Sequence, residues 1–131
     1  MAQLAQRHGR IKGLAEWMSN GTLPEIEQWI REHYMYRPER EEILRSPDHM
    51  MSDLERLGYV EGDCDDATIF VAALFRSMGI PVQMVAIRYN PIPEFEHVFA
   101  EIWTGSGWYT LDPTVKPGTR YRTLERMVEH V

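Results

Sequence analysis

A cysteine, a histidine and an aspartate stand in this chain where they could act together as a nucleophile, a base and an orienting acid. Cys64 is the single cysteine of the 131 residues, and it begins an apolar run typical of a buried helix. A helix N-terminus presents free N–H groups and a partial positive charge, which stabilise a thiolate and an oxyanion. A nearby histidine takes up and returns the thiol proton, and a carboxylate fixes the imidazole tautomer. With His97 opening one predicted strand and Asp112 ending the next, the pattern indicates thiol-dependent acyl transfer.

His97 and Asp112 are expected to be neighbours in a β-hairpin. Strands predicted over 97–103 and 108–111 flank the turn sequence Thr-Gly-Ser-Gly at 104–107. The two residues lie at similar distances along the chain from the centre of this turn. The hairpin therefore places both side chains within reach of each other across adjacent strands.

Each of the three residues also has an ordinary interpretation. A lone cysteine in a reducing compartment is most often a small buried hydrophobe. His97 could be an ordinary strand histidine, and Asp112 could simply end a strand before Pro113. However, Cys64 lies among aspartates, which is unfavourable for a core residue, and the three residues together favour chemistry.

A metal site is a second alternative for the same region. Cys64, Asp65, Asp66 and His97 carry suitable ligand atoms. Adjacent acids at the start of a helix point apart, and one cysteine excludes a multi-cysteine zinc site. We therefore predict neither a metal nor a cofactor, and elemental analysis of the purified protein would settle the point.

The elements expected to position these residues are helices first and an antiparallel sheet afterwards. Helix signals include the capping sequence Thr22 to Glu25, Pro47 after Ser46, and Gly58 as a stop. The predicted helices cover 1–20, 22–33, 46–57 and 64–78, with a loop over 34–45. The predicted strands cover 82–89, 97–103 and 108–111, followed by a short helix over 123–131. This order indicates an α+β fold with the nucleophile helix packed on an antiparallel sheet.

The composition is that of a globular protein. Hydrophobic residues make up 44% and charged residues 26% of the chain, and the net charge is −6. Without a basic patch we expect no nucleic-acid partner. Without a long apolar stretch or signal sequence we expect no membrane span and a cytoplasmic location.

Residues around the three principal candidates have secondary roles in this interpretation. Asp63 and Asp66 are predicted to cap the nucleophile helix. Upstream aromatic residues could supply a second oxyanion donor, although the core is the expected place for each of them. These residues are Trp29, Tyr34 and Tyr36. Trp108, beside the hairpin turn, is expected in the core or lining the cleft.

The charge near Cys64 suggests a substrate preference. Four acids lie close to it in the sequence, namely Glu61, Asp63, Asp65 and Asp66, and residues 89–115 contain no Lys or Arg. We therefore expect a preference for neutral or cationic substrates that weakens as salt rises.

Three segments resemble the transglutaminase-like superfamily. They are Gly62-Asp63-Cys64-Asp65-Asp66-Ala67 with the apolar helix ending at Pro81, the strand His97 to Ile102, and the stretch Gly107 to Thr114. The resemblance covers 60–115 closely and 22–59 loosely. It implies a papain-like fold, a Cys64-His97-Asp112 triad, and activity on protein or peptide amides. The calcium loop of the animal cross-linking enzymes is not recognisable, so calcium activation is not expected.

The resemblance implies an organisation and leaves two functions open. We expect one domain over 1–131, with a helical extension (1–21), a helical part (22–59), a catalytic core (60–115) and a C-terminal tail or short helix (116–131). The first function is a cysteine peptidase, amidase or transglutaminase that works through a thioester. The alternative is a catalytically silent interaction or structural module, associated with phage particles and hence with a virion. Neither the reaction's acyl acceptor nor the oligomeric state follows from the residues.

Overall fold

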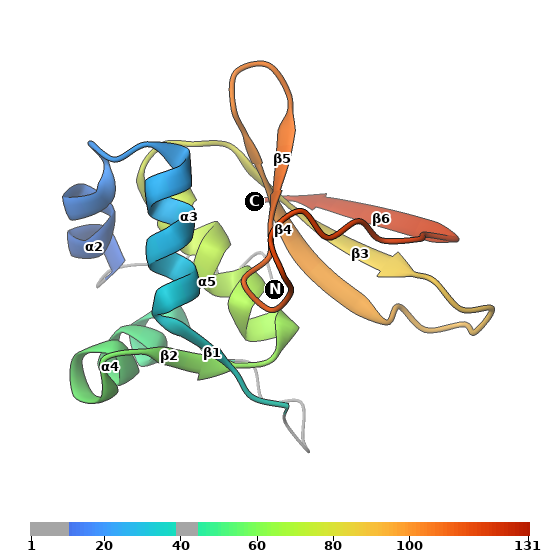
Figure 1. Cartoon of the computed structure of the whole chain (residues 1–131), viewed down its shortest axis with the longest axis horizontal. Helices are drawn as coiled ribbons and strands as arrows, with labels where there is room; N and C mark the ends of the chain where they lie inside the picture. Colours follow the sequence, from blue (N-terminus) through green and yellow to red (C-terminus); the bar gives the residue numbers. More distant parts are fainter. Residues whose placement is uncertain (1–10, 39–44) are drawn as a thin grey trace.

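The computed structural model describes residues 11–38 and 45–131, and it has a helical first half followed by an antiparallel sheet (Figure 1). The described helices are α2 (Ile11–Met18), α3 (Leu23–Glu32), α4 (Pro47–Leu57) and α5 (Cys64–Ser77). The strands are β1 (Tyr34–Tyr36), β2 (Val60–Gly62), β3 (Val82–Arg88), β4 (His97–Trp103), β5 (Trp108–Leu111) and β6 (Glu125–His130). The predicted α+β fold is confirmed. No described helix is long and apolar enough to cross a membrane.

Local sequence signals account for the boundaries of α3 and α4. The Thr22 side chain accepts a hydrogen bond from the Glu25 N–H, and the Glu25 carboxylate accepts one from the Thr22 N–H. Ser46 caps α4 by accepting from the His49 N–H. Gly58 ends α4 with φ 82°, a left-handed conformation that suits glycine.

Helix α5 is the centre of the main core. Ten consecutive residues, from Asp66 to Phe75, are buried. The helix contacts α2 and α4 on one side and β3 and β4 on the other, and it lies between the other helices and the sheet in Figure 1. Burial of a side chain such as Phe70 or Phe75 contributes about 1.5–3 kcal/mol. The rigid packing of α5 fixes the position of its first residue, Cys64.

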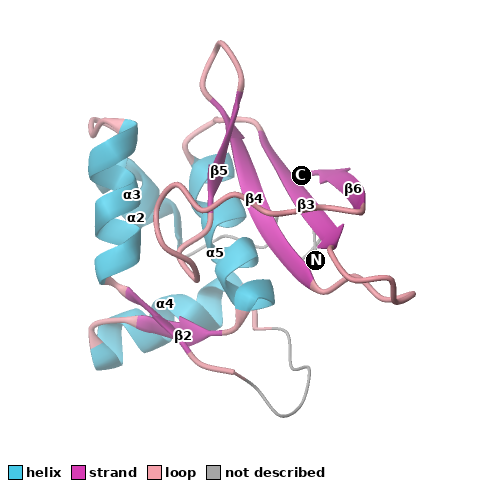
Figure 2. Ribbon diagram, turned by 45° about the vertical axis from the view of Figure 1, so that its right-hand side comes forward, coloured by secondary structure: helices cyan, strands magenta, loops and turns pink. Residues whose placement is uncertain are grey.

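The sheet has the strand order β5-β4-β3-β6, with every neighbouring pair antiparallel. Ala100 and Met84 lie opposite each other and belong to the core that contains α5. The next pair, Phe99 and Val85, belongs to a second small core with Ile87. The chain after β5 runs across β4 and β3 before entering β6 (Figure 2), and its Tyr121 packs against this second core.

The short helix predicted for 123–131 is wrong, because residues Glu125–His130 form strand β6. This strand pairs with β3 from Arg88↔Glu125 to Gln83↔His130. The local composition is compatible with a helix, but β3 would otherwise present an open row of N–H and C=O groups. Pairing with this edge is a long-range effect that local propensity does not record.

Two other sequence-based boundaries also change. Tyr34–Tyr36, predicted as loop, is strand β1 and pairs in parallel with β2, with Tyr36 opposite Gly62. Of the helix predicted over 1–20, the structure describes Ile11–Met18. Residues 1–10 and 39–44 lie outside the described part of the chain.

Candidate active site

Cys64 is the first residue of α5, and its free thiol is partly exposed. The Asp63 side chain accepts hydrogen bonds from the N–H groups of Asp65 (3.0 Å) and Asp66 (3.3 Å). The Asp66 carboxylate in turn accepts from the Asp63 N–H at 3.3 Å. The two aspartates therefore form a capping box that leaves Cys64 at the positive end of the helix.

Gly62 permits this cap because a larger residue would collide with it. A Cβ added at Gly62 would lie 2.6 Å from Cβ of Asp66 and 2.8 Å from its Cγ. Asp66 is fully buried and held by the cap, so its side chain has little freedom to move. A glycine is therefore required before Asp63 and Cys64, because any side chain at position 62 would collide with Asp66.

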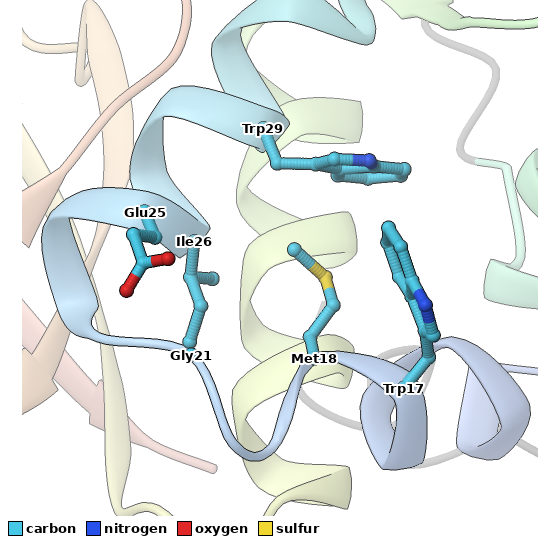
Figure 3. A pocket seen from close by; sticks show the side chains of 6 residues that line it. All are labelled: Trp17, Met18, Gly21, Glu25, Ile26 and Trp29. Carbon is cyan, nitrogen blue, oxygen red and sulfur yellow. The ribbon is translucent and has the colours of Figure 1, made fainter.

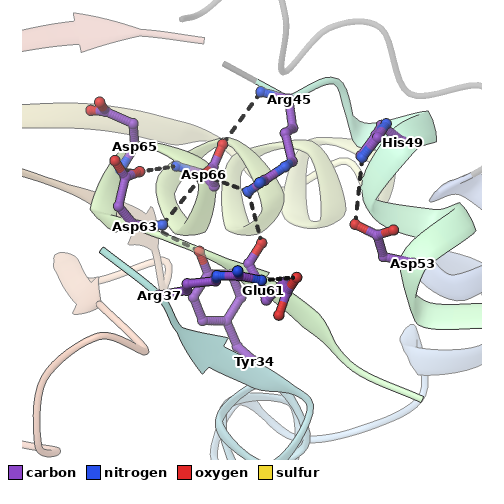
Figure 4. Close-up of polar contacts among 9 residues, drawn as sticks. All are labelled: Tyr34, Arg37, Arg45, His49, Asp53, Glu61, Asp63, Asp65 and Asp66. Atoms are coloured by element: carbon purple, nitrogen blue, oxygen red, sulfur yellow. Dashed lines mark hydrogen bonds and ion pairs between the residues drawn. The ribbon is translucent and has the colours of Figure 1, made fainter. Parts of the chain in front are cut away.

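Two of the four acids around Cys64, Asp66 and Glu61, are paired with cations (Figure 4). Asp66 forms an ion pair with Arg45 at 3.2 Å, and Arg45 also donates to the Glu61 carbonyl. Glu61 pairs with Arg37 at 2.9 Å. These pairs offset part of the negative charge that the sequence places beside the thiol.

His97 and Asp112 are in direct contact. Nε2 of His97 lies 2.6 Å from Oδ2 of Asp112, and both side chains are mostly buried. The last β4–β5 pair is Ala100 with Leu111, so Asp112 follows beside Phe99. Phe99 and His97 are two residues apart on β4 and share a face of the strand. The hairpin therefore brings the pair together diagonally rather than directly across the strands.

Asp112 is held by donors on both of its oxygens. Oδ1 accepts from the Thr114 N–H (3.0 Å) and hydroxyl (2.6 Å), while Oδ2 accepts from Tyr121 as well as from His97. Burial acts to raise the pKa of Asp112, but the bonds from His97, Thr114 and Tyr121 lower it below its usual value. The carboxylate is consequently ionised and fixed in orientation.

Cys64 and Asp112 both act on the His97 imidazole. Burial acts to lower the pKa of His97, but side-chain hydrogen bonds to Asp112 and Cys64, with their negative charges, raise it to about 9. Since Asp112 contacts Nε2, we assign Nδ1 to the thiol. The structure thus brings together all three residues that the sequence singles out.

Tyr121 is a member of this cluster that sequence reasoning missed. Its hydroxyl donates to Oδ2 of Asp112 at 2.5 Å and lies 3.2 Å from Nε2 of His97. Its ring stacks on Phe99 at a centroid distance of 4.9 Å. Burial, followed by the bond to Asp112, raises the pKa of Tyr121, which keeps the phenol protonated. Its only sequence signal is an aromatic residue within a polar, Pro- and Gly-containing segment.

The predicted aromatic candidates occupy four different environments. The Tyr34 hydroxyl donates to the Asp63 carbonyl at 2.7 Å, so it supports the helix cap. Trp29 stacks on His33 and lines a cavity of about 250 Å³ with Trp17 (Figure 3), which no residue of the Cys64 cluster lines.

Tyr36 and Trp108 lie nearer to the cluster. Tyr36 is 53% exposed and pairs with Gly62, so a role as an oxyanion donor stays a prediction. Trp108 packs edge-on against Trp103 and lines a cavity of about 320 Å³ together with Asp112. Within residues 11–38 and 45–131, no group of three or more His, Cys, Asp or Glu is placed to hold a metal ion.

An α+β fold in which a cysteine begins a central helix and meets a histidine on the neighbouring sheet is of the papain-like class. The chain belongs to the transglutaminase-like superfamily, whose family model matches residues 12–113.

Two solved structures share this fold. One is a candidate cysteine protease from Cytophaga hutchinsonii, with a TM-score of 0.58 and 20% identity over 86% of this chain and 41% of that chain. The other is the periplasmic domain of TgpA from Pseudomonas aeruginosa, bound to ethylmercury, with a TM-score of 0.57 and 19% identity over 82% of this chain and 44% of that chain. This chain therefore spans less than half the length of either. A comparison with curated protein sequences finds no match.

Proposed function

We propose that this protein is a thiol-dependent acyltransferase or hydrolase of protein or peptide amides. The observation that carries the proposal is the position of His97, which contacts Asp112 through Nε2 and whose pKa, despite burial, is raised by Asp112 and by Cys64. The superfamily contains cysteine proteases and transglutaminases, and the name of the Cytophaga protein points in the same direction.

The first half of the reaction forms a thioester. The Cys64 thiolate attacks the amide carbonyl carbon, and the resulting oxyanion accepts a hydrogen bond from the Cys64 N–H, which has no partner among the described residues. His97 gives its proton to the amine as the carbon–nitrogen bond breaks. The acyl group is then bound to sulfur, and His97 is neutral.

The second half releases the acyl group. Neutral His97 takes a proton from water or from an acceptor amine, which attacks the thioester carbon. The carbon–sulfur bond breaks, and the thiolate and imidazolium are restored. Water gives hydrolysis and an amine gives transamidation, so the proposal includes both outcomes.

Asp112 and Tyr121 act on the imidazole in this proposal rather than on the substrate. Asp112 holds the Nε2 proton and stabilises the imidazolium. Tyr121, a positioning residue, bonds the same carboxylate oxygen and covers the pair with its ring. Their contacts orient Nδ1 toward Cys64.

The direct experiment is to trap an acyl-enzyme. Wild-type protein is incubated with a peptide library, and intact and digested masses are compared with those of the Cys64→Ala variant. We expect an acyl adduct on the peptide that contains Cys64 in the wild type alone. Absence of any adduct, together with slow reaction of Cys64 with iodoacetamide, would favour the catalytically silent module.

A further inference from the structure

The cavity beside Asp112 differs in charge from the surroundings of Cys64. It has a volume of about 320 Å³, at the lower end of the range for small-ligand sites. Three cations line it, namely Arg31 on α3 and Lys116 and Arg120 in the segment between β5 and β6. The substrate preference expected from the sequence rested in part on residues 89–115, which contain no Lys or Arg. That expectation did not anticipate these three cations, because all of them lie outside that segment.

Two of the three cations are not neutralised by neighbours. Arg31 is paired with Glu27 at 2.9 Å and also donates to the Val115 carbonyl. Lys116 and Arg120 are exposed and form no ion pair with any residue in the described part of the chain. The one carboxylate that lines the cavity, Asp112, is already bonded to His97, Thr114 and Tyr121.

The backbone holds the two free cations at the rim of this cavity. The Thr119 N–H and hydroxyl both donate to the Lys116 carbonyl, at 3.2 and 2.6 Å. Gly118, with φ 78°, has the positive value that a Pro-Gly turn of type II requires. This turn begins at Lys116 and is followed directly by Arg120, while Arg31 donates to the carbonyl of the preceding Val115.

The cavity adjoins the imidazole of His97 on its Nε2 side. Asp112 and Tyr121, which line it, are the residues in contact with Nε2 of His97. His97 protonates the departing amine from Nδ1, the nitrogen assigned to the Cys64 side of the ring. A substrate whose amine portion continues across the imidazole from there reaches Lys116 and Arg120.

We propose that this cavity binds a carboxylate carried by the amine portion of the substrate, so that the amide cleaved or formed has an anionic group on its amine side. The inference rests on the proposed function for the direction of the substrate, but binding of the carboxylate does not require the thiol. The carboxylate belongs either to a C-terminal residue or to an acidic side chain. Lys116 and Arg120 would attract either kind of carboxylate.

A binding experiment separates this inference from catalysis. The Cys64→Ala variant is titrated by NMR with three peptides: trialanine as free acid, trialanine amide, and the amide with Asp in the second position. At 20 mM salt we expect the free acid or the Asp peptide to bind roughly three- to tenfold more tightly than trialanine amide, with less difference at 300 mM salt. Backbone signals of residues 116–120 should shift.

Matched variants identify the cations responsible. Lys116→Gln with Arg120→Gln should remove the preference for the carboxylate. Lys12→Gln with Arg76→Gln is the control, because these cations line a separate cavity with Ser77 and the net charge changes equally. Equal binding of acid and amide, or an equal loss in both double variants, would overturn the proposal. The peptide that binds best identifies the source of the carboxylate.

A second readout uses the reaction. A wild-type acyl-enzyme, once formed, is partitioned between water and the same three peptides as acceptor amines. Acyl transfer should favour the carboxylate peptide by a similar factor, and the Lys116/Arg120 variant should lose this selectivity. Thioester formation without selectivity would overturn this inference alone. Failure to form a thioester would contradict the proposed function and leave the binding result to decide the inference.

Discussion

The hydroxyl of Tyr121 donates a hydrogen bond to Oδ2 of Asp112, the same oxygen that contacts Nε2 of His97. A residue from the segment between β5 and β6 thereby reaches back to the end of β5. The segment after the hairpin is therefore part of the site. Tyr121 has two roles there: its hydroxyl bonds Asp112, and its ring packs on Phe99.

Substitution of Tyr121 tests those roles separately. Tyr121→Phe keeps the ring on Phe99 and removes one of several donors to Asp112, so we expect about 1 kcal/mol of destabilisation. The pKa of His97 should not fall, because a carboxylate with one donor fewer holds the imidazolium at least as firmly. Tyr121→Ala exposes the pair to water, and the pKa should fall toward its ordinary value. NMR titration of His97 measures its pKa in both variants. A fall in this pKa in Tyr121→Phe as large as that in Tyr121→Ala would contradict the separate roles of the hydroxyl and the ring.

The stability of the protein should depend on pH through His97. Its pKa is about 9 in the folded protein, above the ordinary value of 6.5. The folded state therefore binds a proton that the unfolded state releases between these values. The stabilisation is complete below about pH 6.5 and is lost as the pH rises through about 9. Thermal melts should show this fall in the wild type, and His97→Ala should be much less sensitive over the same range.

Asp112→Asn should shift the pH at which His97 loses its proton. The amide removes the charge that holds the imidazolium, so the pKa of His97 should decrease and any alkaline decline in turnover should move to lower pH. Turnover should be reduced less than in His97→Ala. A pH–rate profile that is unchanged in Asp112→Asn would show that the carboxylate does not act on His97.

The buried cap carboxylate should be important for stability. Asp66→Ala leaves Arg45 without its buried partner and removes the bond to the Asp63 N–H, so we expect a loss of about 3–5 kcal/mol. Glu125→Ala is the control, because its pair with Arg88 is more than half exposed on the Glu side and should contribute less than about 1 kcal/mol. Urea unfolding of both variants measures the difference.

Gly62→Ala should damage the same cap from the opposite side. The added Cβ would collide with the buried Asp66 side chain, and overpacking of this kind costs about 1–3 kcal/mol. Gly107→Ala is a suitable control, because nothing lies within 4 Å of a Cβ at that position. We expect Gly62→Ala to lower the unfolding midpoint and the rate of Cys64 alkylation. Full retention of both would contradict the steric argument.

Local signals predicted most of what surrounds Cys64, His97 and Asp112. A capping sequence before an apolar helix and a Gly-containing turn between two strands act over a few residues, and both can be recognised in the chain. The diagonal contact between His97 and Asp112 lay within the error of a register estimated from the turn.

Long-range contacts account for what the sequence did not predict. Strand β6 forms because β3 has a free edge, and β1 forms because β2 lies beside it. Tyr121 reaches Asp112 only after the chain has crossed the sheet. The ion pairs of Asp66 and Glu61 join residues 21 and 24 positions apart, so the charge near Cys64 could not be judged from neighbouring residues alone.

The central claim is that Cys64 and His97 act as one catalytic unit, and single-turnover thioester formation tests it most directly. The wild type is compared with Cys64→Ser, His97→Ala and the double variant, alongside thermal melts. Cys64→Ser makes no large cavity and should change stability by no more than about 1 kcal/mol, yet thioester formation should be abolished. His97→Ala should lose most of the rate, and the double variant should be little worse than either single variant. A His97→Ala protein that is folded and forms the thioester at the wild-type rate would contradict the claim.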